Sequence, residues 1–300
     1  ELRIAINKRI LLINCESESE AKLIDKLARK LRKKVSIGFR LNPNIDAKTH
    51  QKISTGKAEN KFGLSIKNFK SFYKTIKKYK HIKLDALSVH IGSQILSDVP
   101  YKKMLNVMSN LIRELQLDLK FLDLGGGFGI SYNRKDKPID LKKYSESVYK
   151  LAKKLKCKII FEPGRSIIGD TGVLLSKIQY IKKGVKKDFV IIDAGMNDFM
   201  RPALYDAVHK IIPTKKSSSK LKGVIEFVGP ICESTCKFGS YKNYQKMNEN
   251  DFVAITNVGA YGSSLSSNYN SRPLIAELLV NKNKLKYIRK KQDLLKLINS

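Results

Sequence analysis

Short apolar runs alternate with amphipathic stretches over the first half of the chain. The apolar runs are of strand length, and they cover residues 10–14, 35–41, 84–89, 120–124 and 158–161. The stretches between them place apolar residues at helical spacing over residues 18–32, 65–79, 100–116 and 140–155, and residues 1–9 resemble the end of another helix. Five strand–helix repeats of this kind predict parallel β-strands joined by helical crossovers.

Each predicted strand ends in residues that can do chemistry: Glu16, Arg40, His90, Gly125–Gly127, and Glu162 with Arg165. In a (β/α)8 barrel the active site lies at the carboxyl ends of the strands. A doubly wound sheet places ligands there too, but only near a switch point in the strand order. Polar ends on all five strands therefore favour the barrel. We expect residues 1–169 to form the C-terminal part of one, with five strand–helix units present.

The pattern changes after Gly169. Short β-type runs then follow one another without long helices between them, at residues 173–175, 178–181, 189–192, 224–228 and 252–255. They predict a second, mostly antiparallel β domain over residues 170–300, with a loop rich in lysine and serine at 214–222. The last stretch, residues 285–299, has the pattern of a basic amphipathic helix.

The run Phe121–Ile130 ends an apolar strand in three consecutive glycines, Gly125, Gly126 and Gly127. Such a loop lets the backbone turn tightly and bring bare N–H groups close to an anion, usually a phosphate. Glycine-rich loops also occur as simple strand-to-helix turns that only need positive φ, so the loop alone leaves both interpretations open.

Composition changes this picture little. The formal net charge is +32, but the lysines are spread over the predicted outer faces of helices, without aromatic residues interleaved as in RNA-binding sheets. A nucleic-acid binder is therefore the weakest alternative. The four cysteines lack the spacing of a disulfide framework, and Cys232 with Cys236 has no second Cys/His pair for a metal. No apolar run is long enough to span a membrane. We expect a cytoplasmic protein.

Collinear motifs across residues 1–280 carry a family resemblance. They are Ile53–Gly56 with Lys61–Gly63, His90–Gln94, the glycine loop, Glu162–Arg165, Met200–Tyr205, Gly229–Ser234, Gly259–Gly262 and Asn268–Pro273. With these motifs in this order, the chain resembles diaminopimelate decarboxylases, which belong to the alanine-racemase-like (fold type III) pyridoxal-phosphate enzymes. The resemblance implies a (β/α)8 barrel and a β domain, in a homodimer with active sites at its interface.

The resemblance also implies a cofactor site for pyridoxal 5′-phosphate. Gly125–Gly127, Arg165 and Ser93 would hold the phosphate, and His90 would stack on the ring. Glu162 would face the pyridine nitrogen, where a carboxylate strengthens the ring as an electron sink. Gly164 and Tyr261 complete the implied cofactor set. The structural alternatives are a core histidine at His90 and a plain turn with an ion pair at Glu162–Arg165.

By the same resemblance, Cys232 is the proton donor to the carbon that loses carbon dioxide, supplied across the dimer interface. The alternative is an inert buried thiol. The positions that resemble substrate contacts are Arg165, Arg201, Tyr205, Glu233 and Tyr261. Arginines suit a distal carboxylate and Glu233 suits a distal ammonium. The implied reaction converts meso-2,6-diaminopimelate to L-lysine and carbon dioxide. The alternatives are an Arg201 surface salt bridge and a Tyr205 in the core.

The family's Schiff-base lysine lies in a Tyr-Ala-Val-Lys-Ala-Asn-like segment, and no such segment occurs in these 300 residues. We expect it before Glu1, so that the chain as given is inactive alone. A related decarboxylase of basic amino acids or carboxylated polyamines is the second interpretation, although Arg201 argues against a substrate without a distal carboxylate. A non-catalytic homologue that pairs with an intact subunit is the third.

Overall fold

The computed structural model describes residues 1–47, 55–56, 59–133 and 136–299, and these form two compact units. Unit 1 contains residues 1–131 and 136–166, and unit 2 contains residues 132–135 and 167–300. Ile53 and Ser54, which open the first motif of the family resemblance, lie outside the described residues.

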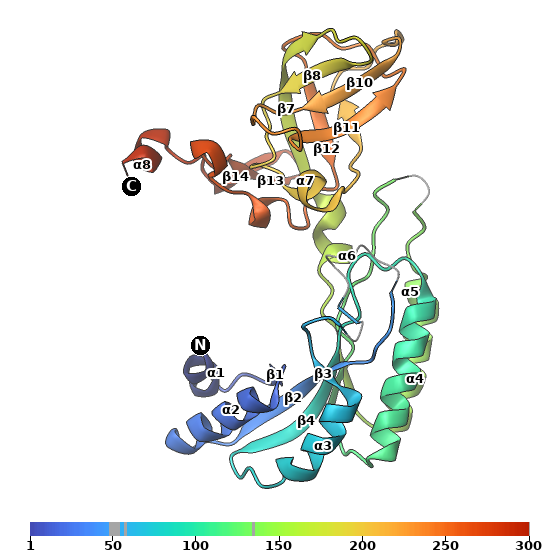
Figure 1. The fold of residues 1–300 in the computed structure, drawn as a ribbon, viewed down its shortest axis with the longest axis vertical. Helices are drawn as coiled ribbons and strands as arrows, with labels where there is room; N and C mark the ends of the chain where they lie inside the picture. Colours follow the sequence, from blue (N-terminus) through green and yellow to red (C-terminus); the bar gives the residue numbers. More distant parts are fainter. Residues whose placement is uncertain (48–54, 57–58, 134–135, 300) are drawn as a thin grey trace. The chain divides into compact units, whose positions relative to one another are not determined.

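Unit 1 is built on one parallel sheet with helices between successive strands (Figure 1). The strands β1 (Ile13–Cys15), β2 (Val35–Asn42), β4 (Ile82–Val89), β5 (Phe121–Asp123) and β6 (Lys158–Ile160) pair in chain order, and β3 (Leu64–Ser65) pairs with β2. The helices are α1 (Leu2–Asn7), α2 (Glu18–Lys30), α3 (Ile66–Ile76), α4 (Asp98–Glu114), α5 (Leu141–Leu155) and α6 (Arg165–Ile168). The predicted parallel strand–helix arrangement is confirmed. Along the described strands β1, β2, β4, β5 and β6 the order in the sheet follows the order in the chain, without the change of direction that marks a switch point.

Local sequence explains where the long helices begin. Ser17, Ser65 and Ser97 each accept a hydrogen bond from a backbone N–H of the first turn of α2, α3 and α4, and Asp140 does the same for α5. Each helix then buries one apolar stripe against the sheet, such as Ala21, Ile24 and Ala28 of α2. This packing fixes the directions of the strands, and with them the positions of their carboxyl ends.

Unit 2 is mostly antiparallel, as the sequence predicted. Its main sheet has the order β11-β10-β8-β7-β12-β9, in which only the β10–β8 pair is parallel. The strands are β7 (Val173–Lys182), β8 (Asp188–Ile192), β9 (Ile211–Pro213), β10 (Val224–Val228), β11 (Lys237–Lys242) and β12 (Phe252–Thr256). The short helix α7 (Arg201–Tyr205) and the 3-10 turns Gly169–Thr171, Ser263–Leu265 and η4 (Tyr269–Ser271) lie in the connections.

The predicted helix over residues 285–299 is wrong. This stretch contains the strand β14 (Lys284–Arg289), which pairs with β13 (Glu277–Asn281), and a short helix α8 (Leu294–Ile298). Lys282 takes a positive φ of 53° in the turn between the strands, and Asp293 caps α8 through Leu295 N. The lysines alternate with apolar residues here at the period of a strand, which a short run does not distinguish well from a helix.

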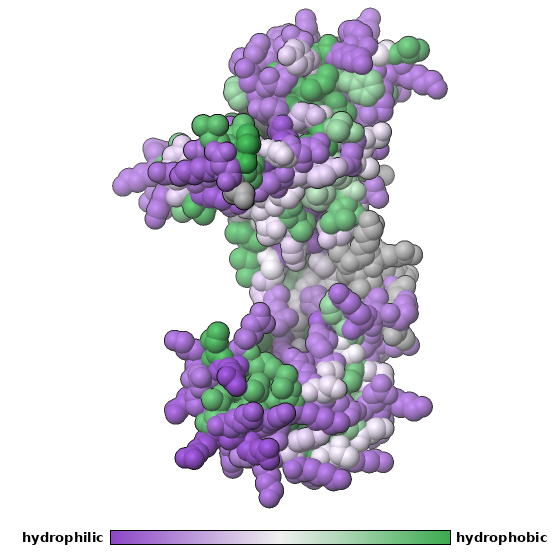
Figure 2. All heavy atoms as spheres, turned by 60° about the vertical axis from the view of Figure 1, so that its left-hand side comes forward, coloured by the Kyte–Doolittle hydropathy of each residue, from purple (hydrophilic) through white to green (hydrophobic). Residues whose placement is uncertain are grey.

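Apolar atoms gather on one face of unit 1, over α1, α2 and the edge strand β1 (Figure 2). Ile4, Leu11 and Leu23 are 65%, 64% and 47% exposed there. A patch of this kind commonly marks a surface that another part of a protein covers. Among the described residues, no helix is both long and apolar enough to cross a membrane.

At the amino ends of the strands of unit 1, Asp85 of β4 joins three segments. Its carboxylate accepts hydrogen bonds from Ser36 Oγ of β2 at 2.5 Å and from Lys120 Nζ at 3.0 Å, and Lys83 Nζ lies 3.3 Å away. Burial opposes ionisation, but these hydrogen bonds and charges outweigh it and hold the pKa of Asp85 below its ordinary value. Asp85 therefore contributes to stability by linking β2, β4 and the residue before β5.

Replacing Asp85 with Asn should lower the free energy of unfolding by about 1–3 kcal/mol at pH 7, measured by urea denaturation. Because the folded pKa is lowered, the contribution of Asp85 is present above the ordinary carboxyl pKa and is lost as the pH falls through the folded value. The difference between the proteins should therefore shrink below about pH 4. The exposed Asp118→Asn is the control, within about 0.5 kcal/mol of wild type; equal loss in both variants would contradict the role of Asp85.

Candidate active site

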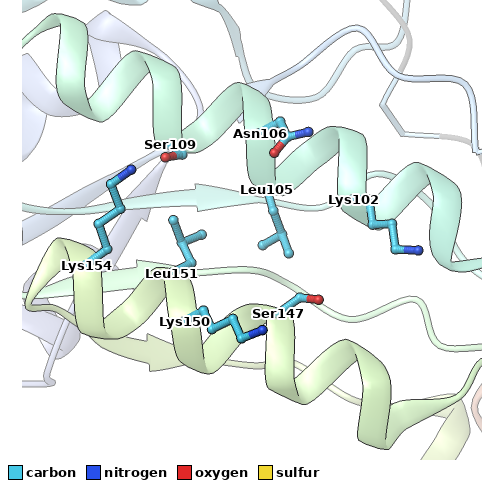
Figure 3. Close-up of a pocket in the computed structure, with 8 residues that line it drawn as sticks. All are labelled: Lys102, Leu105, Asn106, Ser109, Ser147, Lys150, Leu151 and Lys154. Carbon is cyan, nitrogen blue, oxygen red and sulfur yellow. The ribbon is translucent and has the colours of Figure 1, made fainter.

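A groove with a volume of about 470 Å³ lies between α4 and α5, on the helical side of unit 1 (Figure 3). Its walls are Lys102, Leu105, Asn106, Ser109, Ser147, Lys150, Leu151 and Lys154. None of these side chains is an acid, a histidine or a cysteine, so the groove lacks a general acid or base suited to neutral pH. Titratable side chains cluster instead at the carboxyl ends of the strands.

At those ends the glycine loop that follows β5 passes very close to its neighbours. A Cβ on Gly126 would lie 2.1 Å from the carbonyl oxygen of Glu162, and one on Gly127 would lie 2.1 Å from that of Gly92. Gly127 also has a positive φ of 89°. These positions accept only glycine because the backbone fits between the ends of β4 and β6.

The N–H groups of this loop are partly engaged within the protein. Gly125 N donates to Asp123 Oδ1 at 2.9 Å, and Gly126 N donates to His90 Nδ1 at 3.2 Å. Gly125 and Gly126, two of the three glycines predicted to offer N–H groups to a phosphate, therefore already donate these groups to protein side chains. In this conformation two of the three N–H groups fix the side chains of Asp123 and His90.

His90 is held as a defined tautomer. Because Nδ1 accepts from Gly126, the neutral ring carries its proton on Nε2. Burial, and after it the positive charge of Arg40, lower the pKa of His90, while Asp123 opposes them. The backbone carbonyl of His90 also accepts a hydrogen bond from Thr55 Oγ1 at 2.7 Å. The result is a neutral, oriented imidazole beside the glycine loop.

Asp123 and Glu162 form a pair of carboxyl groups. Asp123 is 1% exposed and accepts hydrogen bonds from Asn14 Nδ2 at 2.9 Å and Ser88 Oγ at 3.1 Å. Burial, then the charge of Asp123 and a hydrogen bond to it, raise the pKa of Glu162, while Arg40 opposes them. Donors converge on Asp123, so the pair favours a proton on Glu162.

Arg165, at the start of α6, is 5% exposed and donates from Nη2 to Ser93 Oγ at 3.1 Å. Ser93 follows Gly92, whose carbonyl faces Gly127. A buried guanidinium beside a hydroxyl and a glycine backbone is a donor set that suits a phosphate group. Gly164, the residue before Arg165, is exposed.

In unit 2, the loop between β10 and β11 carries Cys232 and Glu233, and the turn η4 contacts both. Asn270 Nδ2 donates to Cys232 Sγ at 3.6 Å, and Tyr269 Oη donates to Glu233 Oε1. Cys232 is exposed, so it is not the inert buried thiol of the alternative. Cys236 is buried and accepts from Met196 N at 3.3 Å, so the two thiols have different environments.

Arg201 belongs to a different contact group of unit 2. It is 5% exposed, and its Nη1 donates to His209 Nε2 at 2.8 Å, while His209 Nδ1 donates to Thr256 O at 2.9 Å. The guanidinium carbon lies 4.7 Å from the centre of the Tyr132 ring. Arg201 is therefore a buried residue and not a surface one. Tyr205 ends α7 half-buried, and Tyr261 is 45% exposed with a φ of 63°.

Comparison with known proteins identifies the family. Residues 1–169 match the model of the pyridoxal-dependent decarboxylases' pyridoxal binding domain. Diaminopimelate decarboxylase from Aquifex aeolicus is 39% identical over 98% of this chain and 70% of its own length, and that from Helicobacter pylori is 41% identical over 98% and 73%. The chain belongs to the diaminopimelate decarboxylase family. The resemblance predicted from the motifs is confirmed, and so is pyridoxal phosphate as the cofactor.

Solved structures of the family agree. The Helicobacter pylori diaminopimelate decarboxylase complexed with L-lysine has a TM-score of 0.92 at 40% identity and covers 100% of this chain and 75% of its own. The M. jannaschii enzyme in co-complex with L-lysine has a TM-score of 0.90 at 34% identity, over 99% of this chain and 70% of its own.

Some contact residues were missed at the sequence level. The apolar pattern places Asp123 in a predicted strand, although a carboxylate two residues before a glycine loop is itself a signal of a polar site. Asn270 and Tyr269 lie in the motif Asn268–Pro273 but received no role. Asn14, Ser88 and His209 carry no local signal, because only the fold brings them to Asp123 and Arg201.

Replacing Gly126 with Ala should destabilise unit 1 by roughly 2–4 kcal/mol, because the new Cβ would displace the Glu162 carbonyl. It should also weaken binding of the cofactor analogue N-phosphopyridoxyl-lysine at least about tenfold, measured by calorimetry on the 300-residue chain. Gly223→Ala is the control. Its new Cβ would lie in open space, so the strain at a φ of +83° should lower the free energy of unfolding by about 1 kcal/mol without affecting binding of the analogue. Equal affinity in both variants would contradict a role of the loop in the site.

Proposed function

We propose that this protein catalyses the pyridoxal-phosphate-dependent decarboxylation of meso-2,6-diaminopimelate to L-lysine and carbon dioxide, the last step of lysine biosynthesis. The observation that carries the proposal is the polar cluster at the carboxyl ends of β4, β5 and β6. There a neutral imidazole, a protonatable carboxyl group and a buried guanidinium converge around the glycine loop.

These residues fit the cofactor. Arg165 and Ser93 supply charged and neutral donors for the phosphate, with the glycine loop beside them. His90 supplies a ring of fixed tautomer for stacking. Glu162 would face the pyridine nitrogen, where its carboxylate would stabilise the protonated ring. Burial and the charge of Asp123 raise the pKa of Glu162, which suits a group that shares a proton with that nitrogen. When bound, pyridoxal phosphate supplies the electron sink that accepts the electrons released with carbon dioxide. Gly164 and Tyr261 complete the proposed set.

Cys232 is the proposed general acid. A thiol within hydrogen-bond reach of the reacting carbon can replace the departing carbon dioxide with a proton. The thiol is exposed, so a substrate can reach it, and Asn270 fixes its position. The residues proposed for the cofactor phosphate and ring belong to unit 1, and Cys232 belongs to unit 2. As the family resemblance implies, the proposal includes a homodimer with shared active sites, in which Cys232 is supplied across the interface.

The substrate assignment rests on charge. Glu233, oriented by Tyr269, suits the distal ammonium of diaminopimelate. Arg201 and Arg165 suit carboxylates, and Tyr205 and Tyr261 supply further polar contacts. The related enzyme from Helicobacter pylori was solved with L-lysine, the product of this reaction.

We further propose the domain organisation of the protein, the place of its cofactor-linked lysine and its location in the cell. Residues 1–169 would be part of a cofactor-binding (β/α)8 barrel, supported by the sequential parallel strands and by the apolar face over β1, and residues 170–300 would form the β domain with substrate and interface residues. The lysine that the family links to the cofactor would lie outside these 300 residues, which lack its motif. A cytoplasmic location would keep the free thiol of Cys232 reduced.

The full-length protein should form lysine from meso-2,6-diaminopimelate in preference to releasing carbon dioxide from lysine, ornithine or arginine, measured by product analysis over this panel. Glu233→Gln should raise KM for diaminopimelate by roughly tenfold or more, because it removes the charge facing the distal ammonium. The exposed Glu146→Gln is the control and should leave KM unchanged. A preference for ornithine or arginine would favour the related decarboxylase, and an inactive protein that binds an intact subunit would favour the non-catalytic homologue.

A further inference from the structure

The turn η4 contacts two adjacent residues of the β10–β11 loop with two adjacent side chains of its own. Tyr269 donates to Glu233, and Asn270 donates from Nδ2 to Cys232 Sγ at 3.6 Å. This distance suits an N–H···S hydrogen bond, since sulfur is larger than oxygen. The sulfur of the proposed general acid therefore has an amide donor fixed beside it.

The backbone of η4 is strained where it presents this amide. Asn270 has a φ of 53° and a ψ of 35°, and Ser271 follows with a φ of 54°. Asparagine enters the left-handed region more readily than most residues, but the serine that follows it there costs roughly 1–2 kcal/mol. Strain of this kind persists where surrounding contacts hold it, and it concentrates at functional sites.

We propose that Asn270 is a positioning residue for Cys232: its amide N–H orients the thiol and stabilises the thiolate that remains once the proton has been given away. This inference rests on the proposed function, in which Cys232 protonates the reacting carbon. In that step the S–H bond breaks, a C–H bond forms and the electron pair stays on sulfur. The thiolate then recovers a proton from water.

The side chains around the sulfur differ in whether they can donate to it. Glu233 is the next residue, and an ionised carboxylate offers no hydrogen bond to sulfur. The hydroxyl of Tyr269 donates its hydrogen bond to that carboxylate, and this bond and the charge of Glu233 raise the pKa of Tyr269. Tyr269 therefore stays neutral at pH 7, with its proton directed at Glu233 and not at the sulfur. Among the described side-chain contacts of Cys232, the amide of Asn270 is the group that donates to sulfur.

The test measures the rate at which iodoacetamide alkylates Cys232 in the 300-residue chain, followed by peptide mapping against pH. Asn270→Asp keeps the shape but adds a negative charge, and it should slow alkylation at pH 7 by roughly tenfold, which is one pKa unit in the thiolate fraction. Asn270→Gly keeps the left-handed backbone and removes the amide, and it should slow alkylation several-fold. Both rates should approach wild type at high pH, where the thiol is fully ionised.

Asn250 offers a matched control, because it is another exposed asparagine with a positive φ, of 70°, in the same unit. Asn250→Asp and Asn250→Gly should leave the alkylation of Cys232 unchanged. A rate for Asn270→Asp within twofold of wild type at pH 7, or one reduced equally at every pH, would overturn the inference. This result is separate from the product assay, so failure of the proposed reaction and failure of the Asn270 role are distinguishable.

Discussion

The close approach of the Gly125–Gly127 loop to two neighbouring strand ends is the constraint on which the rest of unit 1 depends. No side chain fits at Gly126 or Gly127, because carbonyl oxygens occupy the space where a Cβ would lie. Glu162 N can then donate to Gly125 O at 2.8 Å, and Ile95 N can donate to Gly127 O at 2.9 Å. Backbone hydrogen bonds alone thus connect the segments at the ends of β4, β5 and β6, without any side chain.

The protonation states at these strand ends follow from that backbone arrangement. Gly126 N occupies one ring nitrogen of His90 and leaves the proton on the other. Gly125 N, Asn14 and Ser88 all donate to the carboxylate of Asp123. Burial and then the charge of Asp123 raise the pKa of the adjacent Glu162. A neutral, oriented imidazole and a carboxyl group with a raised pKa therefore lie beside the glycine loop. The glycines therefore allow the close approach of the backbone, and their N–H groups also orient the side chains of Asp123 and His90.

Sequence could predict the elements whose signals are local. The apolar runs gave the strands of unit 1 and much of unit 2, and polar residues after each run indicated which sheet edge carries chemistry. The glycines of the loop were also visible, but their contacts with Gly92 and Glu162 depend on strands far away in the chain. Sequence likewise gives no signal for the contact of Arg201 with His209, which lies beyond α7. It also gives no signal for the hairpin β13–β14, because the turn at Lys282 contains no glycine.

The net charge of +32 illustrates why composition predicts so little of the site. Cations on the surface are screened by water and salt, as for Lys183 and Lys215, whose side chains are 80% and 78% exposed in their ion pairs. Arg165 is 5% exposed, and its field acts through protein rather than water, where the effective dielectric constant is several-fold lower. A single buried guanidinium beside a hydroxyl therefore suits one anion in a fixed geometry, unlike a uniformly basic surface. What selects the anion is burial and geometry, which the fold supplies and the lysine content does not.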